Sequence, residues 1–250
     1  MRYFICLSYR GSNYHGWQIQ PNSNTIQAEL NKALSIILEE KIQCMGCGRT
    51  DTGVHAKEFY AHFDCKKDPS ADKNIIYKIN GCLPPDIAVC KIYLVGPDSN
   101  ARFDAISRSY RYQITQEKDV FNNDYAYYLY GTLDQKKMKK AANIILDHTD
   151  FSSFCKSKTQ SNTNDCNIID SFWEEKNGKL NFHITANRFL RGMVRTLVGT
   201  MIELGQGKLA LNDFSDILLS KDRKRAGFSA PAQGLSLIHI SYPESVLKKQ

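Results

Sequence analysis

A short glycine-rich segment, residues 46–53, carries the residues best suited to chemistry in this chain. It reads Gly-Cys-Gly-Arg-Thr-Asp-Thr-Gly, and its single carboxylate, Asp51, follows two residues after Arg49. Glycine is favoured where a chain turns tightly or where a ligand approaches the backbone. A lone carboxylate beside a guanidinium is a candidate nucleophile or general base. The alternative is structural, because aspartate between glycines commonly accepts hydrogen bonds from backbone amides in a turn.

A second segment, residues 108–112, places arginines between aromatic residues. On a strand, Tyr110 and Tyr112 would point to one side and Arg111 to the other. Such a pattern suits an RNA-binding surface, because bases stack on the rings while guanidinium groups hold phosphates. A half-buried strand whose tyrosines pack into the core is the alternative. The same two alternatives hold for Trp17, which lies in a basic loop punctuated by glycines.

A third segment, residues 189–204, is predicted to be a mainly apolar helix with Arg191 and Arg195 one turn apart near its start. Because most of the helix surface is hydrophobic, at least one of the arginines is expected to be partly buried. Buried arginines are normally paired with an acid. A loop carboxylate from the first half of the chain would be a natural partner, and an ordinary ion pair with an acid such as Glu203 is the alternative.

The composition favours a basic protein with a polyanionic partner. The 250 residues include 33 Lys and Arg against 26 Asp and Glu, a formal net charge of +7. This excess suits RNA, although it is also compatible with general solubility. The apolar runs are far shorter than the roughly 18 residues of a membrane-spanning helix. The N-terminus resembles a first strand rather than a signal peptide. We therefore expect a cytoplasmic protein with no membrane partner.

The eight cysteines do not form a recognisable metal-binding pattern. Cys44 and Cys47 are the only close pair, and no second C-x-x-C follows to complete a zinc site. His55 and His62 lie nearby in the sequence, but their spacing fits no common ligand pattern. Most of the cysteines are therefore expected to be small, partly buried apolar residues, and no metal is predicted.

The hydrophobic pattern predicts the elements that would position these segments. Strands are expected over 2–9, 42–45, a stretch around 59–63, 87–94, 107–115, 166–174, 180–186 and 234–242. Helices are expected after Asn24, with Ile26, Leu30, Leu34, Ile37 and Leu38 on the buried face, and over 72–80, 134–147, 189–204 and 211–220. Asn24 is the expected N-cap of the first helix, with Gln27 at the capping-box position. The pair Asn177-Gly178 predicts a tight hairpin between two of the strands.

The predicted elements follow the order β-α-β-β-α-β twice, which is the ferredoxin-like unit. We therefore predict an α+β fold of two ferredoxin-like lobes, residues 1–100 and 101–250, separated at Gly-Pro-Asp-Ser-Asn, 96–100. The lobes would form a continuous, mainly antiparallel sheet with helices on one face. The other face, or a cleft between the lobes, would bind RNA. The loop of Asp51 would lie at a sheet end, where sites are often built.

Seven short motifs occur in order along essentially the whole chain. They are Tyr14-His15-Gly16-Trp17-Gln18-Ile19-Gln20, Thr25-Ile26-Gln27, Gly48-Arg49-Thr50-Asp51-Thr52-Gly53-Val54-His55-Ala56, Tyr110-Arg111-Tyr112, Asp150-Phe151-x-x-Phe154, Phe189-Leu190-x-x-Met193-Val194-Arg195 and Ala230-Pro231-Ala232-x-Gly234-Leu235. Together they resemble the motifs of the bacterial tRNA pseudouridine synthase A family. The departures are small: Thr52 stands where the family usually has alanine, and Arg191-Gly192 replaces a pair that is often histidines.

The resemblance implies an isomerase that breaks the N-glycosidic bond of a uridine in tRNA and rejoins the ribose to C5 of the same base. It implies that Asp51 is the catalytic carboxylate, that Tyr110 stacks on the target uracil and that Arg195 pairs with Asp51. Arg49 would support the flipped strand or its phosphate. No group enters or leaves, so no cofactor, nucleotide or metal is required. Whether Asp51 acts at the base or at the sugar is left open.

The resemblance also implies a substrate and an assembly. The target uridines would lie on the 3′ side of the tRNA anticodon stem-loop and would be flipped out of the stack, and the enzyme would be a homodimer. A noncatalytic RNA-binding protein of two ferredoxin-like lobes is the alternative, but it has no use for an acid facing phosphate. A hydrolase or phosphotransferase would want further carboxylates for Mg²⁺ near Asp51, and the loop holds none.

Overall fold

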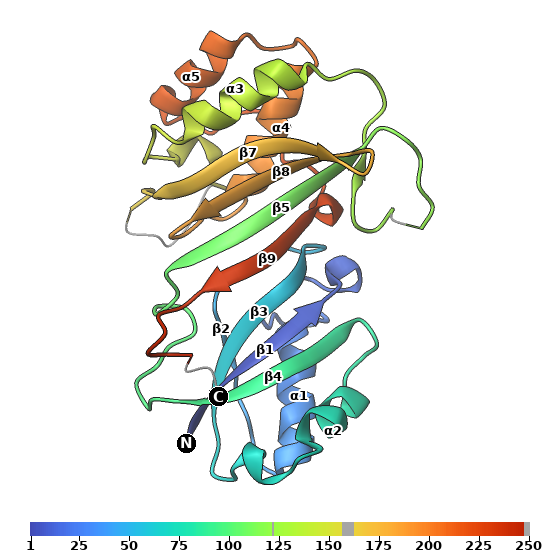
Figure 1. The fold of residues 1–250 in the computed structure, drawn as a ribbon, viewed down its shortest axis with the longest axis vertical. Helices are drawn as coiled ribbons and strands as arrows, with labels where there is room; N and C mark the ends of the chain where they lie inside the picture. Colours follow the sequence, from blue (N-terminus) through green and yellow to red (C-terminus); the bar gives the residue numbers. More distant parts are fainter. Residues whose placement is uncertain (122, 157–162, 248–250) are drawn as a thin grey trace. The chain divides into compact units, whose positions relative to one another are not determined.

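The computed structural model describes residues 1–121, 123–156 and 163–247. The chain forms two compact units (Figure 1): residues 1–106 with 237–250 make unit 1, and residues 107–236 make unit 2. Both units are mixed α/β with mainly antiparallel strands, as predicted for the α+β class, and the described residues contain five α-helices. The predicted second lobe, residues 101–250, included the whole C-terminal end, whereas in the structure the segment from Leu237 groups with unit 1. None of the described helices has the length and apolar character needed to cross a membrane.

Unit 1 is a small antiparallel sheet with two helices. Its elements are β1 (Arg2–Tyr9), α1 (Ile26–Leu38), β2 (Met45–Gly46), β3 (His55–Asp64), α2 (Ile75–Cys82), β4 (Ile87–Val95) and the later part of β9 (Leu235–Ser241). The strand order is β4-β1-β3, with β2 on β3. The central strand β1 is almost wholly buried, and α1 buries Ile26, Leu30 and Leu34. Side chains on both faces of β1 are thus buried, as expected for a strand with neighbours on both sides.

The start of α1 corrects the predicted cap. The N-cap is Thr25 rather than Asn24, and no side chain caps the helix. Instead the amides of Ile26 and Gln27 donate to the carbonyls of Gly16 and Trp17, at 3.2 and 3.0 Å. The Gln27 side chain bonds the Cys44 carbonyl and the Ile19 amide rather than closing a capping box. The loop before the helix thus satisfies amides that a helix leaves unpaired at its start.

Unit 2 is a second antiparallel sheet with three helices. Its elements are β5 (Ser107–Thr115), β6 (Tyr127–Tyr128), α3 (Gln135–Ile145), β7 (Ile168–Lys176), β8 (Lys179–Ala186), α4 (Met193–Gly205) and α5 (Leu211–Ser220). The strand order is β5-β8-β7, and the short β6 runs parallel to β5. Asn177 and Gly178 have positive φ angles of 53° and 69°. These are the angles of the predicted hairpin turn.

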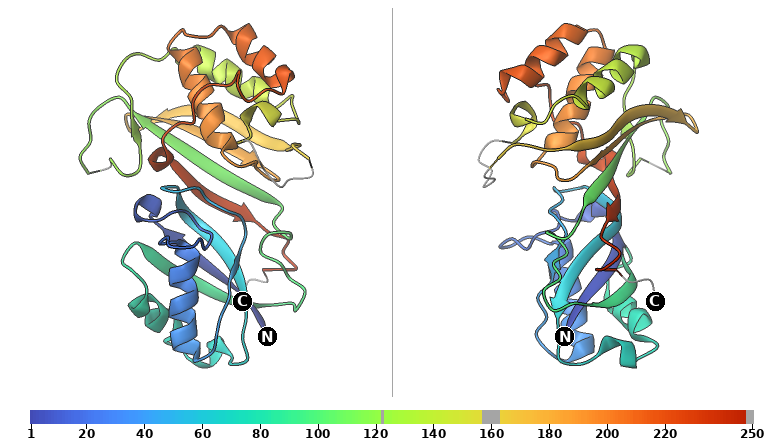
Figure 2. Two further views of the ribbon diagram at one scale, coloured as in Figure 1. Left: turned by 180° about the vertical axis from the view of Figure 1, so that it is seen from behind. Right: turned by 60° about the vertical axis from the view of Figure 1, so that its left-hand side comes forward.

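The sheet of unit 2 has one apolar and one polar face. Figure 2 shows α3, α4 and α5 gathered on one side of this sheet. Tyr112, Phe182 and Trp173 are buried on that side, and the Trp173 indole donates to the Met201 sulfur of α4 at 3.3 Å. We call the opposite side the outer face; it carries Ser109, Arg111, Gln113, Phe172, Glu174, Lys176, Lys179, Asn181, His183 and Thr185. The period-2 alternation of each strand produces this division.

Candidate active site

The Asp51 loop joins β2 to β3 and is fastened to the segment that precedes α1. The Trp17 amide donates to the Thr50 carbonyl at 3.2 Å, and the Gly53 amide donates to the Tyr14 carbonyl at 3.3 Å. The Val54 amide closes a turn onto the Asp51 carbonyl at 3.1 Å. Asp51 thus lies between two residues whose backbones are bonded to the same neighbouring segment, and its side chain remains partly exposed.

Glycines allow the two segments to approach this closely. A Cβ on Gly16 would lie 2.4 Å from the Thr50 carbonyl oxygen, and Gly16 has a φ of +88°. A Cβ on Gly11 would lie 2.0 Å from the Val54 carbonyl oxygen. Both distances are far below van der Waals contact, so any side chain at either position would displace the loop. These glycines are therefore part of the scaffold of Asp51.

Buried aromatic side chains pack near the Asp51 loop. Trp17 is 2% exposed and stacks on Phe59 with ring centroids 4.1 Å apart. A Cβ on Gly46 would lie 2.6 Å from the Trp17 ring, so glycine is required there as well. Tyr14 is also buried and donates its hydroxyl to Asp86. Of the two alternatives for the aromatic loop, packing into the core is therefore the correct one for Trp17.

Two further contacts hold the loop from β1 and from the segment that follows it. The hydroxyls of Tyr9 and Thr50 share a buried hydrogen bond of 2.9 Å. The Gly11 amide donates to Nδ1 of the buried His55 at 3.0 Å, so Nδ1 acts there as an acceptor without a proton. No local sequence pattern predicts either contact, because the partners lie 41 and 44 residues apart.

Removing the Tyr9 hydroxyl should loosen this support without disturbing the strand. We expect Tyr9→Phe to leave the buried Thr50 hydroxyl less well paired and to lower the free energy of unfolding by about 1–2 kcal/mol. Because Thr50 precedes Asp51, turnover of the tRNA substrate that the resemblance implies should fall several-fold, while affinity for that tRNA stays unchanged. Urea titration and single-turnover kinetics measure the two effects. A variant that loses stability but keeps the native rate would contradict a role in positioning Asp51.

Arg49 lies two residues before Asp51 and points its charge to the outside. Its side chain is exposed, and it has no hydrogen bond or ion pair with the residues that the structure describes. An exposed guanidinium of this kind suits a phosphate group, which it can bind through two parallel hydrogen bonds. Arg49 and Asp51 thus share one loop of unit 1.

Tyr110 and Tyr112 point to the same side of β5 but have different surroundings. Tyr112 is fully buried, donates its hydroxyl to the Pro231 carbonyl at 2.8 Å and lies against Gly234, whose Cβ would be 2.6 Å from the ring. Tyr110 is partly exposed and meets the ring of Phe189 edge to face, with centroids 5.2 Å apart. Tyr112 is therefore a core residue, and Tyr110 retains accessible ring surface.

The helix that carries Arg195 begins later than predicted. It starts at Met193, because Gly192 adopts a left-handed φ of 74° at the N-cap. Arg191 therefore lies in the turn before the helix, exposed, and is not one helical turn from Arg195. Arg195 is partly buried and donates its Nε to the Ala230 carbonyl at 2.7 Å, while the Ala230 amide donates back to the Arg195 carbonyl. The side chain is thus oriented by the segment before β9.

The same segment packs closely along α4. A Cβ on Gly199 would lie 1.9 Å from the Phe228 carbonyl oxygen, and the Gly227 amide donates to the Thr200 hydroxyl at 2.9 Å. Helix α4, which carries Arg195, and the segment before Ala230 therefore pack closely together within unit 2. This close contact requires glycine at position 199.

The predicted site residues divide between the two units. Asp51 and Arg49 belong to unit 1, and Tyr110 and Arg195 belong to unit 2. Within the described ranges, no three His, Cys, Asp or Glu side chains gather in a way that would hold a metal ion. Cys44, from the only close cysteine pair, is buried, and burial raises the pKa of its thiol. A raised pKa disfavours the thiolate that binds metals.

Comparison with known proteins agrees with these motifs. Residues 141–243 match a family described as tRNA pseudouridine synthase. The chain is 45% identical to the tRNA pseudouridine synthase A of Bacteroides thetaiotaomicron over 100% of this chain and 93% of the relative. It is 37% identical to the protein of that name from Bacillus subtilis, over 97% of this chain and 99% of the relative. On this similarity along its whole length, the chain belongs to the tRNA pseudouridine synthase A family.

Proposed function

We propose that this protein isomerises uridine to pseudouridine in tRNA and that Asp51 is its catalytic carboxylate. The observation that carries the proposal is the loop between β2 and β3, in which close backbone contacts made possible by Gly11 and Gly16 present one carboxylate. The names of the full-length relatives support tRNA as the substrate.

The other site residues have complementary parts in the proposed reaction. Tyr110 stacks on the uracil with the ring surface that Phe189 leaves accessible. Arg195, held at its Nε by Ala230, pairs with Asp51 and orients the carboxylate. Arg49 holds a phosphate of the flipped strand. The target base leaves its stack to reach the carboxylate.

These residues do all the chemistry that the isomerisation needs from the protein. The N-glycosidic bond breaks, the base turns while it remains bound, and a carbon–carbon bond forms between the ribose and C5. The C5 proton is then lost to water, and the base gains a proton on nitrogen. Nothing is added to or removed from the nucleotide apart from this exchange of protons. The reaction is therefore proposed to require no cofactor, nucleotide or metal.

The architecture proposed around the site is a pair of ferredoxin-like lobes. The strands of unit 1 lie in the order β4-β1-β3-β2, which is the strand order of a ferredoxin-like unit. Its two helices follow the first and third strands along the chain, as in that fold. We propose that the lobes share a continuous sheet with an RNA-binding cleft and that the protein acts as a cytoplasmic homodimer. The proposed targets are uridines on the 3′ side of the tRNA anticodon stem-loop.

Tritium release tests the proposal directly. The protein is incubated with an unmodified tRNA transcript that carries uridine tritiated at C5, with no added metal or nucleotide. We expect tritium release to water and pseudouridine on the 3′ side of the anticodon stem-loop, mapped by chemical modification and primer extension. Binding of the transcript without any release would instead favour the noncatalytic RNA-binding protein.

A further inference from the structure

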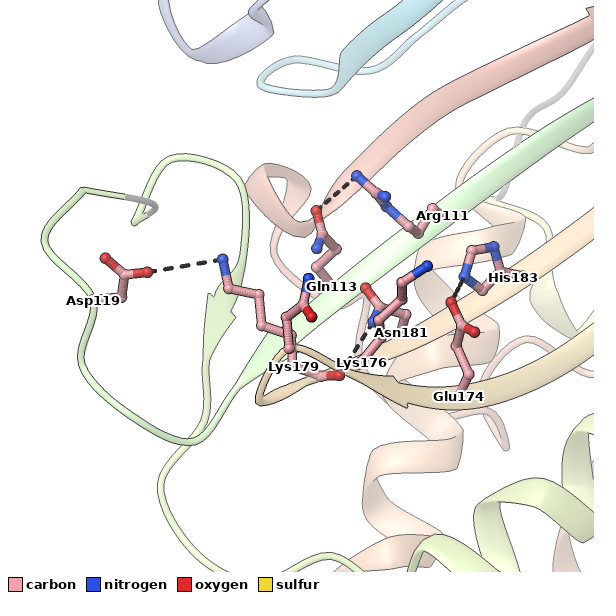
Figure 3. A pocket seen from close by; sticks show the side chains of 9 residues that line it. Arg111, Gln113, Asp119, Glu174, Lys176, Lys179, Asn181 and His183 are labelled. Carbon is pink, nitrogen blue, oxygen red and sulfur yellow. Dashed lines mark hydrogen bonds and ion pairs between the residues drawn. The ribbon is translucent and has the colours of Figure 1, made fainter.

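The outer face of unit 2 is hollowed by a polar pocket of about 520 Å³. Nine residues of β5, β7, β8 and the adjoining loops line it: Arg111, Gln113, Asp119, Glu174, Lys176, Asn177, Lys179, Asn181 and His183. Figure 3 shows their side chains, which come together over the strands. Arg111 alternates with Tyr110 along β5, so it points away from the side of the sheet where Tyr110 meets Phe189. The pocket is thus separate from the proposed uracil contact.

Cations in this pocket outnumber the acids that engage them. Lys179 Nζ lies 3.8 Å from an Asp119 carboxylate oxygen, and His183 Nε2 lies 2.9 Å from a Glu174 carboxylate oxygen. The two acids of the pocket therefore already have partners. Lys176 is exposed and has no ion pair with the described residues. Among the described residues, Arg111 bonds the neutral Gln113 amide oxygen, at 3.0 Å, and has no acidic partner. The lining thus carries three Lys and Arg charges against two carboxylates, a net charge of +1 with His183 counted as neutral.

Two buried polar atoms in the pocket lack hydrogen-bond partners among the described residues. They are Nε of Arg111 and Oδ1 of Asn181, and Asn181 is only 4% exposed. Buried polar groups of folded proteins are almost always paired. An unpaired guanidinium N–H is a hydrogen-bond donor suited to a phosphate oxygen, and the amide oxygen accepts from a hydroxyl or a bound water. The pocket therefore contains a donor for a phosphate oxygen and an acceptor for a sugar hydroxyl.

An aromatic surface lies beside the pocket. Phe172 on β7 is opposite His183 on β8, and the two rings stack nearly parallel, 9° apart in orientation with centroids at 4.9 Å. Phe172 is 39% exposed, so part of its ring is accessible on this polar sheet face. Bases stack on exposed aromatic rings of sheet surfaces in several RNA-binding folds.

We propose that the outer face of unit 2 binds a nucleotide of RNA, with its phosphate held by Arg111 and Lys176 and its base stacked on Phe172. The site adds an RNA contact beyond the reacting uridine and contributes affinity rather than chemistry. A second copy of this chain suits the surface less well, because protein interfaces are depleted of lysine and of unpaired charge at their centres. The excess of cations favours a polyanion.

Two substitutions at exposed positions test the proposal with little risk to the fold. Lys176→Gln and Phe172→Ala should each weaken the binding of an unmodified tRNA transcript about 3- to 10-fold, measured by fluorescence anisotropy. KM should rise by the same factor while kcat stays native, because neither residue touches the reacting base. For Lys176→Gln, the slope of log affinity against log salt should decrease by about 0.7–0.9, the loss of one phosphate contact.

A matched control is Lys140→Gln on the exposed side of α3, which removes the same charge from unit 2 away from the outer face. Its affinity should change less than twofold. Native affinity in both variants, with a native salt slope for Lys176→Gln, would overturn the proposal. A change in molar mass by sedimentation with unchanged tRNA affinity would also overturn it and would assign the face to a second copy of the chain. Anisotropy reports binding even if the transcript is not isomerised, so this test is independent of the proposed activity.

Discussion

Replacing Asp51 with asparagine is expected to reduce tritium release from tRNA by at least about 10³-fold, the scale of losing a catalytic acid–base or nucleophilic group. Asparagine has the same shape, and the bond from the Val54 amide to the backbone carbonyl of Asp51 does not depend on the carboxylate. The loop should therefore keep its conformation while the carboxylate is lost. Affinity for tRNA should stay within about threefold of native, because the phosphate contacts are unchanged.

The matched control for this result is Asp98→Asn, which removes one exposed carboxylate from a loop of unit 1. It should release tritium at the native rate. Native release by the Asp51 variant would contradict the catalytic role and leave Asp51 as a turn residue. Loss of release together with a lower thermal midpoint and weaker tRNA binding would assign Asp51 a structural role. Anisotropy and thermal unfolding distinguish these outcomes.

Elements with a regular apolar period were predictable from the sequence. The bounds of β1, β5 and α5 agree with the predicted ranges, because alternation and helical spacing report which side chains are buried. The ends of helices were less predictable. The first residues assigned to α4 are excluded by the left-handed Gly192, and α2 runs over Ile75–Cys82 rather than 72–80. The spacing of apolar residues does not report the backbone angle of a single glycine, so it could not predict this helix start.

The candidate site residues were predictable from the sequence, but the contacts that hold them in place were not. Residue types and motif spacing identified Asp51, Arg49, Tyr110 and Arg195 as candidates, and their roles remain predictions. The contacts that orient them come from distant parts of the chain, such as the Ala230 carbonyl at Nε of Arg195, 35 residues away. Sequence patterns describe neighbours along one element, whereas these contacts depend on tertiary packing. The pocket of the outer face was missed for the same reason.

The glycine scaffold gives the second large expected effect. Gly16→Ala places a methyl group 2.4 Å from the Thr50 carbonyl oxygen and requires alanine to adopt a φ of +88°. The left-handed conformation alone costs alanine roughly 1–2 kcal/mol. The contact with Thr50 is with backbone, so it can be relieved only if the Asp51 loop moves by about 1 Å, a misplacement that typically costs about 10²-fold in rate. We expect the rate constant of single-turnover reactions to fall by that factor, and kcat to fall with it if chemistry limits turnover.

Gly81→Ala is the matched control, because a Cβ at Gly81 in α2 meets no atom within 4 Å. That substitution should leave the rate native and slightly stabilise the helix, since alanine is favoured over glycine there by about 1 kcal/mol. If Gly16→Ala kept the native kcat while its thermal midpoint fell, the glycine would serve folding alone. A lower kcat with tRNA binding retained would show that catalysis depends on where the loop holds its carboxylate. The close contact between Gly16 and the Thr50 carbonyl would then be required for the reaction, because it determines the position of Asp51.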